Sequence, residues 1–442
     1  MLEKKRWREL ILTLKQSPFF KNLLIVMSGT AIAQMISYAI SPIISRLFSP
    51  SDFGIFGSFS ALVSIVGALI TLDYSQAIML PKEKVEALNL FCLSISSTTL
   101  ITLLIITISL IKPSIVYSLT KTTGVWPIIF LILSLMVVGI NQSCQAWAVR
   151  EKAFRRTSAS QVIRSLSSSS ARIIFGLFKT GSLGLIISNL IADLAATLTL
   201  IKVVLKDLLI NNSSISLKKM RLMAREYLDF PLYSATQNFI NAISSGLPVL
   251  LLTRFYGLTI AGSYAFGVNL LIAPMGLILT ALRQVLFQKA CEYQHQEKGL
   301  FLLYIRTILI LFSLIFFPAL IILLWGPQIF TFIFGARWLM AGIMAKSLII
   351  WLAFAFCNLP AVLFARIIRI QKFVFFYDLA LLFIRTSILV IGGLLLKVTH
   401  TIMIFATAGA IMNLFLIFYV GKALYKKELI NQRITWDSLF NS

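Results

Sequence analysis

One stretch of the chain combines cationic, amide and hydroxyl side chains at helical spacing. In TSASQVIRSLSSSSARIIFG, residues 157–176, the side chains of Gln161, Arg164, Ser165, Ser168 and Arg172 fall on one helical stripe, at steps of three and four residues. A guanidinium group donates paired hydrogen bonds to phosphate oxygens, whereas Ser and Gln bind sugar hydroxyls. The stripe therefore predicts a water-filled path for an anionic head group that carries sugar. The alternative is that Arg164 reaches the aqueous boundary and that the serines only allow close helix packing.

Further charged side chains interrupt apolar runs elsewhere in the chain. An ionisable group inside a membrane-spanning helix costs about 2.5–3.5 kcal/mol on insertion scales and usually faces a cavity or a partner. We expect five more cations to contribute to an anion-binding cavity: Arg46, Arg254, Arg306, Lys346 and Arg385. The alternative for Arg306 is that it only reaches the cytoplasmic interface.

Three acids within apolar runs are candidates for coupling transport to an ion: Asp73, Asp193 and Asp378. A carboxyl group in a medium of low dielectric can take up a proton, which is the property that coupling needs. Alternatively, each acid neutralises a nearby arginine. Asp378 and Arg385, seven residues apart, share a helix face but lie too far apart along it to touch directly. The alternative to a transport role for either residue is a pairing across helices.

These polar residues stand out because the chain is otherwise strongly apolar. Its 442 residues are 58% hydrophobic, and the mean hydropathy is +0.91, whereas soluble domains are about 45–50% apolar. Runs of about twenty apolar residues can cross a hydrocarbon core about 30 Å thick, and they must be helical because lipid offers the backbone no hydrogen-bond partners. We therefore predict an all-α integral membrane protein.

The apolar runs predict about twelve transmembrane helices in two pseudo-symmetric six-helix bundles. An N-terminal lobe, 1–205, contains runs at 19–47, 53–80, 87–111, 126–148, 158–178 and 182–205. A C-terminal lobe, 231–442, contains runs at 231–253, 258–287, 300–324, 338–364, 373–396 and 401–424. A polar cytoplasmic linker, 206–230, joins the lobes. Residues 2–16 favour an amphipathic helix on the membrane surface, or else a frayed basic tail.

The two lobes share a motif at an offset of 208 residues, which takes Arg46 to Arg254, Gly54 to Gly262 and Gln76 to Gln284. An even number of spans in each half makes the two repeats parallel. That arrangement predicts a substrate site between them and two bundles that rock about the linker.

The basic residues are distributed unevenly among the loops. The chain has 40 Lys and Arg against 16 Asp and Glu, a formal net charge of +24. A soluble protein with this excess would suggest nucleic acid as a partner. Here the bases lie mostly in alternate short loops, and the opposite loops hold only Arg46, Lys112, Lys121, Lys179, Arg254, Arg337 and Lys397. The positive-inside rule then predicts cytoplasmic termini and no nucleic-acid partner.

No pattern in the sequence indicates catalysis, a metal site or a cofactor. The cysteines stand singly, the two histidines, His295 and His400, are far apart, and no GxxxxGK[ST] motif is present. We therefore predict a protein that is not an enzyme and that takes its energy from an ion gradient, the membrane potential or the substrate gradient.

Four motifs carry a resemblance to a known family. They are SRLFSPSDFGIFGSF from Ser45, YSQAIMLPK from Tyr74, AGSYAFGVNLLIAPMGLI from Ala261 and FGARWLMAG from Phe334. With the span count, they make the chain resemble the polysaccharide-unit (O-antigen-unit) flippases of the Wzx or PST type, within the superfamily of multidrug, oligosaccharidyl-lipid and polysaccharide exporters. The last motif departs from the pattern at Ala336 and Arg337, where similar proteins often carry acids, so a role for acids there is not carried over.

The resemblance implies a specific transport function. Such proteins move an undecaprenyl pyrophosphate-linked oligosaccharide from the cytoplasmic to the outer leaflet of the bacterial inner membrane by alternating access, for polymers such as the O-antigen of lipopolysaccharide or capsule. In this chain Arg46, Arg172 and Arg254 would hold the pyrophosphate while the tail stays in lipid. A polysaccharide polymerase or ligase and the membrane lipids are the partners that the resemblance implies.

Three other functions compete with this interpretation. A drug or organic-cation antiporter of the same fold would favour buried carboxylates and aromatic faces, but the spans hold more bases than acids. An exporter of the peptidoglycan precursor typically has two further spans. A glycosyltransferase or polymerase would need a catalytic acid in a sizeable outer loop, and Asp52 is the main acid in the loops predicted to lie outside.

Overall fold

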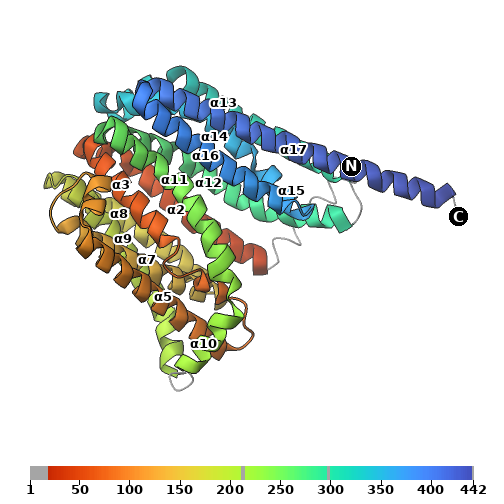
Figure 1. Cartoon of the computed structure of the whole chain (residues 1–442), viewed down its shortest axis with the longest axis horizontal. Helices are drawn as coiled ribbons and strands as arrows, with labels where there is room; N and C mark the ends of the chain where they lie inside the picture. Colours follow the sequence, from red (N-terminus) through yellow and green to blue (C-terminus); the bar gives the residue numbers. More distant parts are fainter. Residues whose placement is uncertain (1–17, 211–214, 296–298, 441–442) are drawn as a thin grey trace. The chain divides into compact units, whose positions relative to one another are not determined.

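The computed structural model describes residues 18–210, 215–295 and 299–440, and these residues are almost entirely helical (Figure 1). They contain no β-strand. Eleven of the described helical segments are long and apolar enough to cross a membrane. The prediction of an all-α, multi-pass membrane protein is thus confirmed. The predicted amphipathic helix at 2–16 lies outside the described residues.

The chain divides into two compact units, Met1–Thr253 and Arg254–Ser442. In the first unit, the helices are α2 (Pro18–Leu47), α3 (Pro50–Gly67), α4 (Tyr74–Ala77), α5 (Lys84–Ile111), α6 (Ser114–Thr120), α7 (Trp126–Arg150), α8 (Phe154–Leu177), α9 (Ser182–Ile210), α10 (Leu217–Glu226), the π-helical turn η2 (Phe230–Ser234) and most of α11 (Ala235–Tyr256). In the second, they are α12 (Leu258–His295), α13 (Leu300–Phe334), the 3₁₀ turn η3 (Ala336–Trp338), α14 (Leu339–Cys357), α15 (Leu359–Ile367), α16 (Gln371–Leu395) and α17 (Val398–Phe440).

Two predicted spans are not single helices. The run at 53–80 is interrupted after α3, because Leu72 and Asp73 adopt left-handed backbone angles, φ 49° and 57°, before the short helix α4 begins. The run at 338–364 is divided between α14 and α15 at Asn358, and Pro360 stands in the first turn of α15, where its missing N–H removes no helical hydrogen bond. In the second unit, the segment that matches α3 and α4 at the offset of 208 residues lies within the single helix α12, which continues without a break through Gln284. The interruption between α3 and α4 is therefore not repeated there.

The boundary between the two compact units falls inside α11 and not in the predicted linker. Residues 206–230 contain the end of α9, the helix α10 and the start of η2. α11 is tied to the first unit by a hydrogen bond of 2.7 Å between the hydroxyls of Ser58 and Thr253. The two six-helix lobes, 1–205 and 231–442, therefore stay a prediction about which bodies move during transport.

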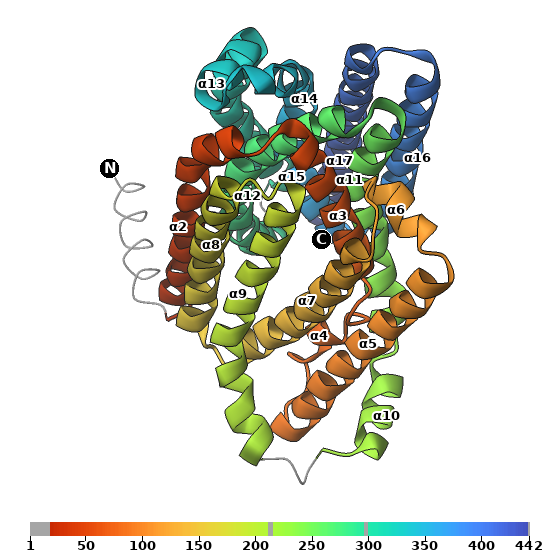
Figure 2. The ribbon, with the colours of Figure 1, turned by 90° about the vertical axis from the view of Figure 1, so that its left-hand side faces the viewer.

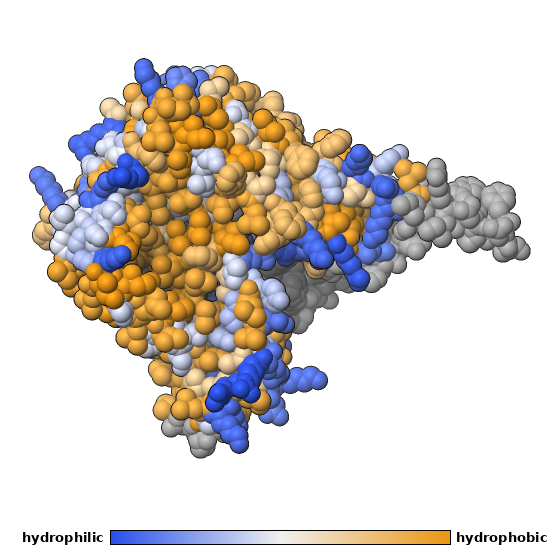
Figure 3. Space-filling view, viewed as in Figure 1, coloured by the Kyte–Doolittle hydropathy of each residue, from blue (hydrophilic) through white to orange (hydrophobic). Residues whose placement is uncertain are grey.

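Each unit has an apolar core of its own and exposes further apolar side chains outward. In the first unit Trp147 is fully buried and meets the ring of Phe91 edge to face at 6.1 Å. In the second unit Tyr304 is fully buried and packs on Phe364 at 5.4 Å. Large apolar side chains such as Leu104 on α5 are exposed, which is the surface that lipid covers. Figure 3 shows apolar residues over most of the face drawn, and hydrophilic ones over α10.

Helix α8, which corresponds to the predicted fifth span at 158–178, lies between α2 and α9 (Figure 2). It is not among the eleven apolar segments because it carries four arginines and seven serines. Small residues bring it close to α2: a Cβ on Gly29 would meet the hydroxyl of Ser158, and one on Gly176 would lie 2.8 Å from Cβ of Leu47. Such close approach lets polar side chains of the two helices meet.

Candidate functional site

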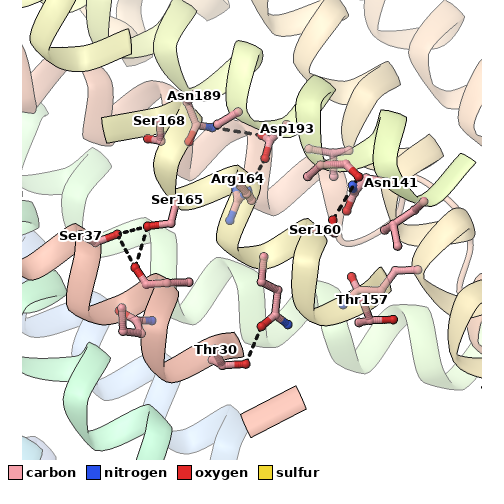
Figure 4. A pocket seen from close by; sticks show the side chains of 18 of the residues that line it. Thr30, Ser37, Asn141, Thr157, Ser160, Arg164, Ser165, Ser168, Asn189 and Asp193 are labelled. Carbon is pink, nitrogen blue, oxygen red and sulfur yellow. Dashed lines mark hydrogen bonds and ion pairs between the residues drawn. The ribbon is translucent and has the colours of Figure 1, made fainter. Parts of the chain in front are cut away.

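A polar cavity of about 510 Å³ lies within the first unit, between α2, α7, α8 and α9 (Figure 4). The predicted stripe on α8 forms one wall, since Gln161, Arg164, Ser165, Ser168 and Arg172 all line the cavity. Asp193 on α9 lines it as well. The structure therefore brings together the residues that the spacing on α8 had placed on one face.

Most of the lining can form hydrogen bonds. Six side chains are carboxamides, from Gln34, Asn141, Gln142, Gln145, Gln161 and Asn189. Six are hydroxyls, from Thr30, Ser37, Thr157, Ser160, Ser165 and Ser168. The charged ones are Arg164, Arg172 and Asp193, which leaves one positive charge in excess. Carboxamides and hydroxyls both donate and accept, so this wall can satisfy sugar hydroxyls in more than one orientation.

Part of this polar surface holds the helices together. Between α2 and α8, Thr30 donates to Oε1 of Gln161 at 2.5 Å, and the hydroxyls of Ser37 and Ser165 lie 3.0 Å apart. Between α8 and α9, the hydroxyl of Ser160 donates to the carbonyl of Ala196 at 3.0 Å. Three neutral lining side chains make no hydrogen bond to the described residues and can serve a ligand: Gln34, Gln145 and Ser168.

Arg172 is the cation with the fewest protein partners in the cavity. Its Nε is buried and has no hydrogen-bond partner, and its guanidinium carbon lies 5.4 Å from the centroid of the Phe56 ring on α3. Within the described residues, no carboxylate lies within 4 Å of it. A cation over an aromatic face gains only about 0.5–2 kcal/mol. Arg172 thus retains the capacity to bind an anionic ligand.

Arg164 is the partner of an acid. Its Nε donates to Oδ1 of Asp193 at 2.5 Å, and Nδ2 of Asn189 donates to the other carboxylate oxygen at 3.2 Å (Figure 4). The side chain of Arg164 is 54% exposed, whereas that of Asp193 is 11% exposed. Of the two roles expected for Asp193, coupling or neutralisation of an arginine, the structure shows the ion pair.

We expect a double-mutant cycle on this pair to give a measurable coupling energy. Arg164→Gln and Asp193→Asn should each lower the melting temperature of the detergent-purified protein, and the double variant should recover part of the loss. The coupling should be about 1 kcal/mol, since Arg164 is half exposed and solvent screens the pair. Additive losses in the double variant would show that the two side chains do not act as a pair.

Asp73 lies outside this cavity, in the interruption between α3 and α4. It is 6% exposed and accepts hydrogen bonds from the Ser234 hydroxyl at 2.5 Å and from Nδ2 of Asn238 at 2.7 Å. No cation among the described residues lies within 4 Å of its carboxylate. Asp73 therefore binds the interrupted segment to η2 and α11 through neutral donors only, and a π-helical turn such as η2 often marks a functional position.

The remaining predicted residues are dispersed. Arg46 is exposed in the last turn of α2, outside the cavity lining. In the second unit, Arg254, Arg306 and Lys346 are exposed, Asp378 is half-buried, and Arg385 is 9% exposed. No polar contact of their charged groups brings these five residues together among the described residues.

Sequence reasoning missed the amides that complete the cavity. Asn141, Gln142 and Gln145 stand together on α7, in the run NQSCQ within a predicted span. Amides inside an otherwise apolar helix are a readable signal, because an unsatisfied carboxamide is costly in lipid. Gln34 on α2 and Asn189 on α9 gave the same signal.

Comparison with known proteins places the chain in a family and a fold. Residues 43–343 match the model of the family described as polysaccharide biosynthesis protein. No curated protein sequence matches the chain. Among solved structures, it is similar to the lipid II flippase MurJ in an inward closed conformation, with a TM-score of 0.68 and 14% identity over 92% of each chain.

Two other solved structures have the same fold. One is an outward-facing multidrug resistance MATE family transporter of the MOP superfamily, with a TM-score of 0.61 and 15% identity over 93% of this chain and 96% of that one. The other is a MOP superfamily transporter from Pyrococcus furiosus, described by the reversed polarity of its binding pocket. Its TM-score is 0.59, with 17% identity over 92% of this chain and 96% of that one. The fold is thus that of MOP-superfamily transporters, and the chain belongs to the polysaccharide biosynthesis protein family.

Proposed function

We propose that this protein is a flippase for a polyprenyl pyrophosphate-linked oligosaccharide, with undecaprenyl as the lipid. It would carry the repeat unit from the cytoplasmic to the outer leaflet of the bacterial inner membrane, with both termini cytoplasmic, for a surface polysaccharide such as O-antigen or capsule. Transport would proceed by alternating access of the two lobes, without catalysis and without a cofactor. A polymerase or ligase would act on the flipped unit.

The observation that carries this proposal is the polar cavity in the first unit. Its excess positive charge and the unpaired Nε of Arg172 suit a pyrophosphate, and its amides and hydroxyls suit the attached sugars. A volume of about 510 Å³ lies within the range of about 300–1,000 Å³ for small-molecule sites. The cavity would enclose the head group and the first sugars, while the polyprenyl tail stays in lipid.

The decisive test is the pool of lipid-linked glycan in a bacterium that lacks this protein. Accumulation of a pyrophosphate-linked oligosaccharide in the cytoplasmic leaflet, relieved by the intact gene, would support the flippase and identify the sugar. An unchanged pool would refute it. Leaflet location can be assigned by the access of an added glycosidase in vesicles of known orientation.

A second candidate is a drug or organic-cation antiporter. The observation in its favour is Asp193 in the cavity, together with a fold shared with multidrug transporters. The ion pair with Arg164 opposes it, because a cationic drug would have to displace a guanidinium held at 2.5 Å. This candidate predicts new sensitivity to cationic drugs in the deletion strain, with an unchanged glycan pool.

For energy coupling, we propose that Asp73 is the acid that responds to the driving ion. Of the three acids considered, Asp193 is paired with Arg164, and Asp378 is more exposed than Asp73. Asp73 is buried, and it contacts donors that are neutral in the described structure. Binding of that ion would compete with the Ser234 hydroxyl and the Asn238 amide for the carboxylate, and so loosen α11 from the interrupted segment.

In proteoliposomes, Asp73→Asn should therefore make the rate of flipping independent of an imposed gradient of protons or of sodium, because the neutral amide has no charge with which to bind the ion. The unsubstituted protein should respond to the gradient and to its reversal. Asp378→Asn serves as a matched comparison. An unaltered response in Asp73→Asn would exclude Asp73 as the coupling group.

A further inference from the structure

Arg385 on α16 is a buried cation enclosed by aromatic rings in the second unit. It is 9% exposed. Its guanidinium carbon lies 4.2 Å from the centroid of the Trp351 ring on α14 and 5.4 Å from that of Phe405 on α17. Trp351 and Phe405 in turn meet edge to face at 5.6 Å. The cation is thus fixed between three helices of one compact unit.

No carboxylate among the described residues forms an ion pair with this guanidinium, and Asp378 acts on it only from a distance. Asp378 is seven residues earlier on the same helix, about 10 Å away along the axis. Taking a charge out of water costs several kcal/mol, whereas contact with an aromatic face returns about 0.5–2 kcal/mol. The aromatic contacts and a distant carboxylate therefore leave part of this cost uncompensated.

Hydrogen-bond donors without a partner accompany the charge. Nε of Arg385 and Nε1 of Trp351 are both buried with no acceptor, and so is the hydroxyl of Tyr377, on α16. Buried donors in native proteins are almost always paired, so two unpaired N–H groups on side chains that touch each other indicate an acceptor from outside the chain. A guanidinium and an indole N–H can hold an anion and cannot ligate a metal cation.

The surroundings limit the size of that acceptor. α17 approaches the pair at Gly409, where a Cβ would lie 2.8 Å from Cδ1 of Trp351 and 3.3 Å from Nη2 of Arg385. The pair is therefore confined on this side by a helix backbone. Together with the low exposure of Arg385, this confinement disfavours an oligosaccharide pyrophosphate and favours a single small ion.

We propose that Arg385, with the N–H of Trp351, binds a small monovalent inorganic anion such as chloride within the second unit. The bound anion would neutralise the buried guanidinium and thereby stabilise the packing of α14, α16 and α17. This site is separate from the polar cavity of the first unit and does not depend on the proposed flippase function. It replaces the direct substrate contact that the sequence suggested for Arg385.

The test uses the full-length protein in detergent, with sodium chloride exchanged for sodium gluconate at constant ionic strength. Thermal unfolding, followed by light scattering and size exclusion, should show a saturable rise of the melting temperature with chloride and with bromide. Arg385→Gln should abolish that rise. Arg366→Gln, which removes an exposed guanidinium from the same unit, should retain it. A parent protein insensitive to chloride, or an equal response in both variants, would overturn the proposal.

Two further arms keep the test decisive. If Arg385→Gln does not fold, Trp351→Phe takes its place, because it keeps the aromatic face and removes the N–H. This variant should raise several-fold the chloride concentration that gives half of the maximal shift in melting temperature. An unchanged concentration would count against the site. Titration with pyrophosphate distinguishes the source of the anion. Stabilisation by pyrophosphate but not by chloride, lost in Arg385→Gln, would reject the small ion in favour of a substrate contact.

Discussion

Replacing Arg172 by glutamine is expected to lower flipping of the lipid-linked oligosaccharide by a factor of about ten to a hundred, while the protein still accumulates in the membrane. Hydrogen bonds to a charged group contribute about 1.5–3 kcal/mol, and each 1.4 kcal/mol is a factor of ten. In the structure Nε of Arg172 has no partner to lose, so the variant removes a ligand contact without leaving a protein group unsatisfied. The measurement is the rate at which labelled lipid-linked glycan changes leaflet in proteoliposomes.

Arg221→Gln on α10 is the matched control, because it removes an exposed guanidinium outside the cavity. It should flip normally. Arg172→Lys should retain part of the activity, since it keeps the charge and loses the paired donors. Full activity in Arg172→Gln would remove the cavity of the first unit from the transport path.

The second large effect is expected at Gly342, where α14 meets α13. A Cβ at this position would lie 2.7 Å from Cα of Pro327 and 2.8 Å from the carbonyl oxygen of Gly326. Both are backbone atoms, so no side chain can turn away and the helices must separate. Gly342→Ala should destabilise the second unit by about 1–3 kcal/mol, the usual range for overpacking. Gly342→Val should prevent accumulation of the protein.

Gly276→Ala on α12 is the control for Gly342→Ala. A Cβ there would meet nothing within 4 Å, so this variant gains helix propensity without a clash. The melting temperatures of the two alanine variants in detergent should therefore move apart. Equal melting temperatures would mean that α13 and α14 do not pack at this distance.

The α8 wall of the cavity could be predicted from sequence because it depends on local spacing. Helical periodicity alone puts Gln161, Arg164, Ser168 and Arg172 on one face of α8. Because contact with lipid is costly for such a polar face, it is expected to face a cavity or a polar partner. The order of the apolar spans followed from hydropathy, since in lipid the backbone must satisfy itself, whereas the breaks after α3 and α14 did not.

The rest depended on contacts between residues far apart in the chain. The choice of Asp193 as partner for Arg164 is set by the packing of α8 on α9, and periodicity does not reveal which neighbours a helix will have. The interruption at Leu72 and Asp73 was hidden because the run 53–80 is apolar throughout, and it is the tertiary bonds from Ser234 and Asn238 that hold the turn. The aromatic enclosure of Arg385 likewise joins three separate helices.

The polarity of α8 has a consequence for how the protein is made. A helix with four arginines and seven serines has little tendency to leave the translocon for lipid alone, since each arginine near the centre opposes insertion by about 2.5–3.5 kcal/mol. α9 follows after a short turn, is strongly apolar and supplies the carboxylate for Arg164. We therefore expect the two helices to enter the bilayer together as a hairpin. If α8 failed to insert into the bilayer, every later helix would cross the membrane in the opposite direction. The residues of α8 that form the cavity therefore also affect the membrane topology of the second half of the chain.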